Sequence, residues 1–243
     1  MNDQSMIIKE RMNSIMRMVA ASSLAGQVHV EEGKIRIAKP LQNSKGQYVF
    51  DLKNDQVDNL VTFNLDRNDV FIPARWAYQL GIKNKNTRVE QLFTFVPVND
   101  GVKPSAYAQG FTSENIKALY DGFVQWTLDN TVVYSRYPME KFYKIPETQP
   151  AFILKSDDSA VSESIQLERR LDNDLELMYP RFIIAGTRDH KISVNFDAAG
   201  LSFPLNDPTN YEAELVLYMD GFLIKGGCQN GDRSPFGDVV GNW

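Results

Sequence analysis

Few residues of this sequence combine the types and the spacing that catalysis requires. It has two histidines, His29 and His190, and either could in principle serve a Ser-His-Asp triad. A Gly-x-Ser-x-Gly nucleophile elbow is absent, as are HExxH and any other two-histidine metal spacing. His29 stands between two valines of an alternating stretch, and His190 follows Asp189 in a turn-like segment. We therefore expect both histidines on the surface.

Cysteine and glycine suggest no cofactor site either. Cys228 is the one cysteine, so neither an intrachain disulfide nor a cysteine-based metal cluster can form, which fits a reducing compartment. The phosphate-binding patterns GxxxxGK[ST] and GxGxxG are missing, and the Gly226-Gly227 pair opens no predicted helix. The sequence thus predicts neither a cofactor nor a metal.

Carboxylates are plentiful, so pairs of them say little. The densest groups are Asp157 with Asp158, and Asp172, Asn173 and Asp174. A glycosidase needs two carboxylates facing each other across a cleft, which a sequence cannot show. The triplet offers oxygen ligands for calcium but lacks the spacing of an EF-hand and is typical of a solvated turn. We expect a protein that is not an enzyme, with a carboxylate hydrolase as the minor alternative.

The charge balance argues against a general affinity for nucleic acid. Lys and Arg total 26, Asp and Glu total 31, and the net charge of -5 repels phosphate backbones. Acidic neighbours dilute the best basic candidates, which are Lys9, Arg11, Arg17, Lys34, Arg36 and Lys39. Charges interrupt the apolar positions of residues 1–24, so we expect no signal peptide. No apolar run approaches the roughly 20 residues of a membrane span, and we expect a soluble protein.

The N-terminal segment has the period of an amphipathic helix. Ile8, Met12, Ile15, Met16 and Val19 recur every three or four residues and share one face. That face either packs on its own domain or belongs to a helical arm, residues 1–25, that docks on a neighbouring subunit or a membrane surface. The low positive charge of the segment argues against strong membrane binding.

After Gly26 the period changes to two, which is typical of strands. The clearest hairpin joins Phe123–Thr127 to Thr131–Ser135 through Asp129 and Asn130. Further hairpins are predicted between Val28–Val30 and Ile35–Ile37 with a turn at Glu31–Gly33, between Arg181–Ala185 and Lys191–Phe196, and between Tyr211–Met219 and Phe222–Ile224 with a turn at Asp220–Gly221. Other predicted strands are Tyr48–Leu52, Asn59–Leu65, Val70–Ile72 ending at Pro73, Gln91–Val96, Ala151–Leu154, and a strand–turn–strand within Ile165–Tyr179.

Roughly twelve short strand candidates without βαβ alternation predict a mostly β fold, an antiparallel β-sandwich or jelly roll. Short connecting helices are expected, one of them at Ser113–Tyr120. The body would span residues 26–225. A glycine-rich C-terminal arm, residues 226–243, would follow and end in Trp243, which either anchors in a partner's pocket or remains disordered.

Aromatic residues make up 11% of the chain, and they keep a second function open. Exposed rings could form a platform that stacks on sugars, as in a carbohydrate-binding or adhesin-type β-sandwich module. Trp126, however, lies in a predicted strand beside Phe123 and Val124, where core packing is the expected role.

Two pieces of the chain show a pattern known from a viral family. Residues 119–149, LYDGFVQWTLDNTVVYSRYPMEKFYKIPETQ, form a predicted strand–turn–strand with a following segment. Residues 181–226 repeat that style, with a proline–asparagine loop between their strands. This pattern resembles jelly-roll capsid proteins of tailless bacteriophages. The resemblance implies a virion location after synthesis in the host cytoplasm, and it carries over no site residues.

These observations favour a virion structural protein, a coat subunit that assembles with copies of itself as a trimer or larger ring. Other virion proteins or an underlying membrane are possible further partners. The predicted assembly residues lie in the two arms and are Met12, Ile15, Met16, Val19 and Trp243.

Overall fold

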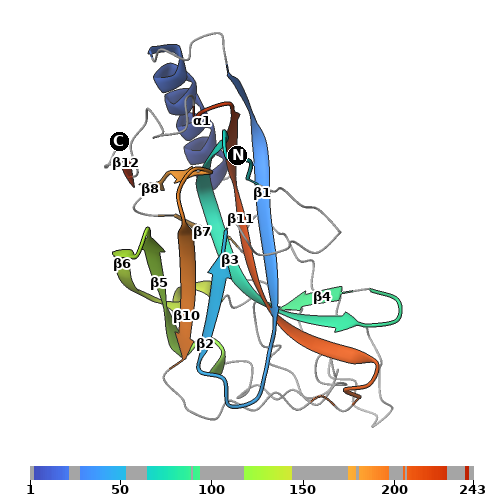
Figure 1. Ribbon diagram of the computed structural model, residues 1–243. Coiled ribbons are helices and arrows are strands. Elements are labelled where there is room, and N and C mark those ends of the chain that lie inside the picture. Colours follow the sequence, from blue (N-terminus) through green and yellow to red (C-terminus); the bar gives the residue numbers. More distant parts are fainter. Residues whose placement is uncertain are drawn as a thin grey trace, which may run out of the picture.

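The chain is mostly β and has two antiparallel sheets, as Figure 1 shows for the computed structural model. The structure describes residues 3–21, 28–52, 65–88, 90–93, 118–143, 175–178, 181–196, 205, 207–228 and 239–240. The elements are α1 (Asp3–Ala21), β1 (His29–Pro40), β2 (Gln47–Asp51), β3 (Val70–Asn84), β4 (Glu90–Phe93), β5 (Gly122–Leu128), β6 (Thr131–Pro138), η1 (Met139–Phe142), β7 (Glu176–Leu177), β8 (Arg181–Phe182), β9 (Ile184–Ala185), β10 (His190–Phe196), β11 (Tyr211–Lys225) and β12 (Val239–Val240).

The larger sheet is built around two long antiparallel strands. β3 and β11 pair from Val70 with Ile224 to Asn84 with Tyr211, and β1 pairs with the other side of β11. The order is β1-β11-β3-β4, and the short strands β7 and β9 also pair with β3. The four-stranded sheet has the order β2-β10-β5-β6, and β8 pairs separately with β12.

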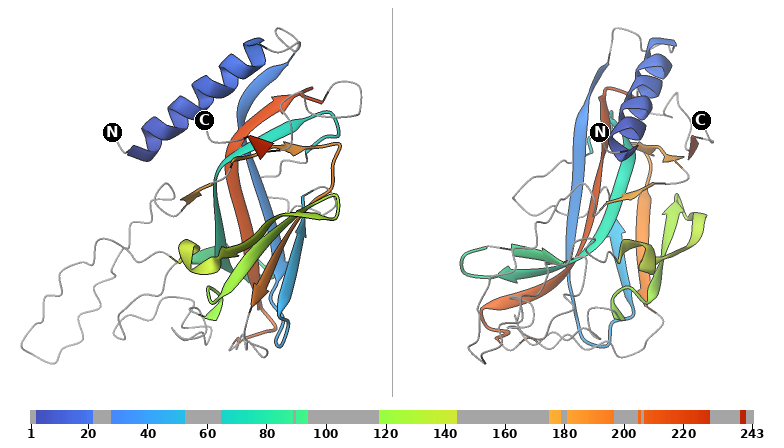
Figure 2. Two further views of the ribbon diagram at one scale, coloured as in Figure 1. Left: turned by 90° about the vertical axis from the view of Figure 1, so that its left-hand side faces the viewer. Right: turned by 180° about the vertical axis from the view of Figure 1, so that it is seen from behind.

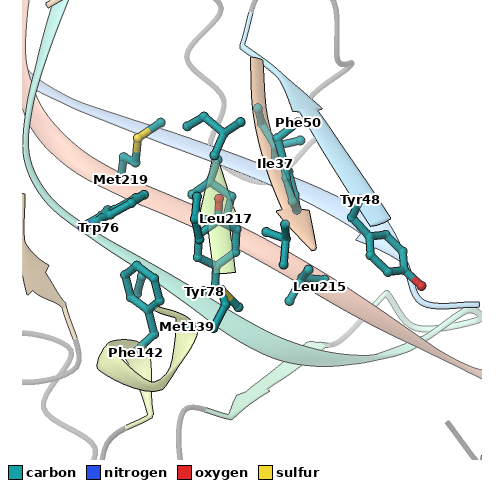
Figure 3. Packing of buried hydrophobic residues seen from close by; sticks show 14 of the residues in the cluster. Ile37, Tyr48, Phe50, Trp76, Tyr78, Met139, Phe142, Leu215, Leu217 and Met219 are labelled. Carbon is teal, nitrogen blue, oxygen red and sulfur yellow. The ribbon is translucent and has the colours of Figure 1, made fainter. Parts of the chain in front are cut away.

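The main core lies between these two sheets, as expected for a β-sandwich. Figure 3 shows side chains of both sheets in this core, and the ring of Phe50 in β2 meets that of Tyr78 in β3 edge to face, at a centroid distance of 5.6 Å. Trp76 and Tyr78 of β3 make edge-to-face contacts with Phe142 of η1, at ring-centroid distances of 4.9 and 5.2 Å. Such aromatic pairs stabilise a core beyond the apolar area they bury.

A second cluster holds helix α1 against the larger sheet. Ile15 and Val19 of the helix are buried with apolar residues of β3, β9 and β11. The helix lies beside the ends of β3 and β11 that are farthest from β4 (Figure 2). Arg11 is 3% exposed, and its Nη1 donates a hydrogen bond of 2.6 Å to the carbonyl of Ala74 in β3. The predicted helix is therefore confirmed, and part of its apolar face packs on its own body.

Two predicted turns are wrong because each lies within a continuous strand. β1 runs through Glu31–Gly33, and β11 runs through Asp220–Gly221. Gly33 and Gly221 face each other in the β1–β11 ladder. A Cβ on Gly33 would lie 3.2 Å from the Phe71 ring, so glycine here serves close packing rather than a turn.

The predicted end of a strand at Pro73 is also wrong. β3 continues to Asn84, and its register with β11 shifts at this point, because Asp220 faces Arg75 while Gly221 faces Pro73. Ala74 is the extra residue of a β-bulge. Bulges are among the few places where a sheet accepts a proline, which has no N–H for the ladder.

The hairpin at Asp129 and Asn130 is confirmed by β5 and β6. Both turn residues have positive φ, 44° and 67°, as the tight primed turns between strands require. The predicted hairpin of Arg181–Ala185 with Lys191–Phe196 is wrong. β9 pairs with β3 of the larger sheet, whereas β10 pairs with β2 and β5 of the smaller one.

Several predictions fall outside the described residues. The described parts do confirm strands close to Tyr48–Leu52 and at Gln91–Phe93. Predictions that lie wholly or mostly outside the described parts are the strands at 59–65 and 151–154, the strand–turn–strand at 165–179, the helix at 113–120, and Trp243.

Candidate functional site

The two histidines lie in opposite environments. The His29 side chain is 72% exposed and its Nε2 lies 3.6 Å from a carboxylate oxygen of Glu31, which confirms the surface prediction. His190 is only 3% exposed, so the surface prediction is wrong for it. The indole N–H of Trp126 donates to His190 Nδ1 over 3.4 Å, and this contact between two sheet strands is not visible in the sequence. Neither environment forms a catalytic triad among the described residues.

Other reactive groups are held in inert surroundings. Cys228 is buried, and this burial raises the pKa of its thiol, which keeps it protonated and a poor nucleophile. Burial also raises the pKa of the Tyr78 hydroxyl. Within the described ranges, no group of three or more His, Cys, Asp or Glu residues is placed to hold a metal ion. The carboxylate groups at 157–158 and 172–174 lie outside those ranges.

The tryptophans of the described part do not form a sugar-binding platform. Trp76 and Trp126 are each 1% exposed. Trp126 stacks on Phe182 with a ring-centroid distance of 4.3 Å. The core role predicted for Trp126 is confirmed, and the carbohydrate-binding alternative loses the residue that best supported it.

An open hollow lies where β5, β6 and η1 meet. Its walls include Asp121, Phe123, Arg136 and Glu140. The Arg136 guanidinium lies over the Phe123 ring, 4.7 Å from its centroid, which is a typical distance for a cation–π interaction. The described residues supply one cation, Arg136, and two exposed carboxylates, Asp121 and Glu140, at this hollow.

Helix α1 exposes some of the predicted assembly residues and buries others. Ile15 and Val19 are 4% and 7% exposed, and Met12 packs partly against the same cluster. Met6 and Met16 point away and are 48% and 49% exposed. The helix therefore keeps a small apolar outer surface, whose contact with a second subunit stays a prediction. No helix in the described ranges is long and apolar enough to cross a membrane.

The borders of the sheets are the other candidate surfaces. β6 borders the smaller sheet, but two register shifts interrupt its ladder with β5, and such bulges protect an edge from further pairing. β2, at the opposite border, has only 5 residues. β1 borders the larger sheet with 12 residues in an unshifted register, and among the described strands it pairs only with β11.

β1 thus offers the longest regular border in the described part of the chain (Figure 1). A border strand leaves alternate N–H and C=O groups without a ladder partner, which makes it a template for another strand. Sequence reasoning missed this surface because it divided β1 into a hairpin. The apolar alternation changes phase across Gly33, from Val28 and Val30 to Ile35 and Ile37, so the sequence held no signal for one continuous strand.

Comparisons with known proteins do not assign this chain to a family. No protein-family model matches the chain. No curated protein and no solved structure matches it either.

Proposed function

We propose that this protein is a structural subunit that works by assembling with copies of itself. The observation that carries the proposal is the long regular border strand β1, which can accept a further strand along 12 residues. Main-chain pairing at a sheet border supplies affinity without a specialised pocket. The exposed methionines of α1, Met6 and Met16, add a second surface, which is apolar. Methionine side chains are flexible and can adapt to a partner.

The assembly that we propose is a virion coat built on a jelly-roll form of the sandwich. Its support is the resemblance of residues 119–149 and 181–226 to capsid proteins of tailless bacteriophages, together with the two-sheet body. Coat subunits tile by symmetry, so a self-complementary surface is the feature they need. The expected partners are copies of the chain, with other virion proteins or an underlying membrane as further contacts.

Electron micrographs of the purified full-length protein test this function. A coat subunit is expected to give shells, rings or regular oligomers. Isolated small particles of uniform single-subunit size, at every protein concentration imaged, would exclude the proposed function. A glycan array serves as the control for the binding-module alternative, because a self-assembling coat subunit predicts no selective sugar binding.

A further inference from the structure

The charges of β1 are segregated along the strand. Glu31 and Glu32 precede Gly33, and the basic residues Lys34, Arg36 and Lys39 follow it. Two copies of β1 lying antiparallel about Gly33 would bring the acidic segment of each strand beside the basic segment of the other. A parallel pairing would instead place like charges together, which is unfavourable in neighbouring strands.

We infer that β1 pairs antiparallel with β1 of a second copy about a two-fold axis at Gly33, which joins the larger sheets of two subunits. This inference rests on the proposed function and names the interface within it. A two-fold contact of this kind is isologous, because the same surface serves both partners.

The faces of the sheet restrict the register. Ile35 and Ile37 are buried on the core side, so alternation places Glu32 and Lys34 on the opposite side, where both are exposed. For the joined sheet to keep each core on the same face, residues of like orientation must lie opposite each other. The symmetry axis must then pass through a residue and cannot pass between two residues.

Charge favours Gly33 as the axis, because this position pairs a glutamate with a lysine and opposes no like charges, whereas an axis at Ile37 or Ala38 pairs no charged residues. With Gly33 on the axis, Glu32 of each copy faces Lys34 of the other, and no like charges are opposed. An axis at Glu32, Lys34 or Arg36 would place that residue opposite its own copy. An axis at Ile35 would place Lys34 opposite Arg36. Opposite charges in cross-strand pairs stabilise a ladder, and like charges destabilise it.

The surroundings of Gly33 fit this position. Glycine has no side chain to collide with its own copy at the axis, and its core side is already filled by Phe71 and Leu223. Glu31 is engaged within its own chain by Lys225, at 2.7 Å between the carboxylate and Nζ. In the β1–β11 ladder Glu32 lies opposite Phe222, and Lys34 lies opposite Asp220, whose carboxylate is paired with Arg75. Glu32 and Lys34 thus supply the specific contact between copies, and their charges also discourage pairing in the wrong register.

Charge reversal tests the pairing in the full-length protein. The single changes Glu32→Lys and Lys34→Glu each place two like pairs at the interface, and each should weaken association by roughly tenfold or more. The double change Glu32→Lys with Lys34→Glu restores two opposite pairs and should recover association. The matched control reverses Glu140 and Lys141, two exposed neighbours in η1, and should leave association unchanged.

Register is tested by disulfide formation between copies. Residues directly opposite in an antiparallel ladder have Cα atoms about 4.5–5.5 Å apart, which a disulfide can bridge. Glu32→Cys mixed with Lys34→Cys should give crosslinked dimers under mild oxidation, and either variant alone should give far fewer. Wild type, whose single Cys228 is buried, controls for unspecific crosslinking.

The outcomes separate the interface from the function. Wild-type protein that never self-associates would overturn the proposed function itself. Wild-type protein that associates, with no loss in the single variants and no crosslink in the mixture, would overturn the β1 interface alone. Recovery in the double variant, together with crosslinking confined to the mixture, is the result that supports the pairing. Thermal unfolding of each variant confirms that a loss of association is not a loss of folding.

Discussion

Three glycines of the described strands and loops leave very different room for a side chain. A Cβ on Gly221 would lie 2.2 Å from the backbone oxygen of Ile72 at the β-bulge. A Cβ on Gly33 would meet Leu223 at 3.1 Å, and one on Gly46 would meet only the Phe196 oxygen at 3.9 Å. Steric demand at the residue scale therefore falls from Gly221 to Gly33 to Gly46.

The corresponding alanine variants are predicted to lose stability in the same order. Gly221→Ala must displace backbone and should lower the free energy of unfolding by about 3 kcal/mol. Gly33→Ala should cost about 1 kcal/mol, because Leu223 and Phe71 can shift by a few tenths of an ångström. Gly46→Ala is the control and should change the free energy of unfolding by about 0.5 kcal/mol or less. Urea unfolding measures all three, and equal losses at Gly221 and Gly46 would contradict the packing described at the bulge.

The protonation of Asp129, in the β5–β6 turn, makes the stability of the fold depend on pH. A hydrogen bond from the backbone N–H of Asp189 lowers the pKa of its carboxyl, and the Arg188 guanidinium lowers it further. A carboxyl with a lowered pKa stabilises the fold above its unfolded-state pKa, about 3.9, and this contribution is lost as the pH falls through the folded-state pKa.

Asp129→Asn should remove that pH dependence while keeping the turn, because asparagine also accepts a hydrogen bond and tolerates positive φ. The variant should be less stable than wild type at neutral pH, and the difference should shrink in acid as Asp129 becomes protonated. Unfolding by urea across an acidic pH series measures it. Asp121→Asn, a like change at an exposed aspartate, controls for general charge effects. A difference that stays constant down to strongly acidic pH would argue against this role for Asp129.

At the scale of elements, helix α1 depends on a few buried contacts. Ile15 and Val19 lie in the cluster with β3, β9 and β11, whereas Met16 faces outward. Ile15→Ala should lower the free energy of unfolding by about 2–4 kcal/mol, because it leaves a cavity under the helix. Met16→Ala should change it by about 0.5 kcal/mol or less. Hydrogen exchange of the helix amides reports docking directly, and equal protection in the two variants would contradict the packing of α1 on its own sheet.

The sequence predicted those elements whose signals are local. The turn at Asp129 and Asn130 depends on two adjacent residues that tolerate positive φ, so the hairpin could be predicted. Gly33 and Asp220–Gly221 carry equally strong turn signals, yet they pack against each other inside long strands. Their meaning depends on the pairing of segments far apart in the chain, which no local pattern contains.

The candidate site was predictable to the same limited degree. The helical period showed that one face of α1 is apolar, but it could not show whether the chain's own sheet or a neighbour covers that face. The structure shows that the chain's own sheet covers Ile15, whereas Met16 is exposed. The charge segregation of β1 was readable in the sequence, but its importance appears only once β1 is one strand at the border of a sheet.

At the scale of the whole molecule, one border strand and one helix surface are the described surfaces through which we propose that copies meet. β6 is interrupted by bulges and β2 is short, so β1 is the described border best suited to extend a sheet. A single two-fold contact closes a dimer, and larger closed assemblies need a second, different contact. The outward methionines Met6 and Met16 of α1 are among the exposed apolar residues of the described part that we propose for it.

Light scattering of the purified wild-type protein over a wide range of concentrations measures the central claim most directly. The account predicts an average particle mass that rises with concentration and levels off at an even multiple of the subunit mass. Glu32→Lys should shift this rise to higher concentration. A mass equal to one subunit at every concentration would contradict the account.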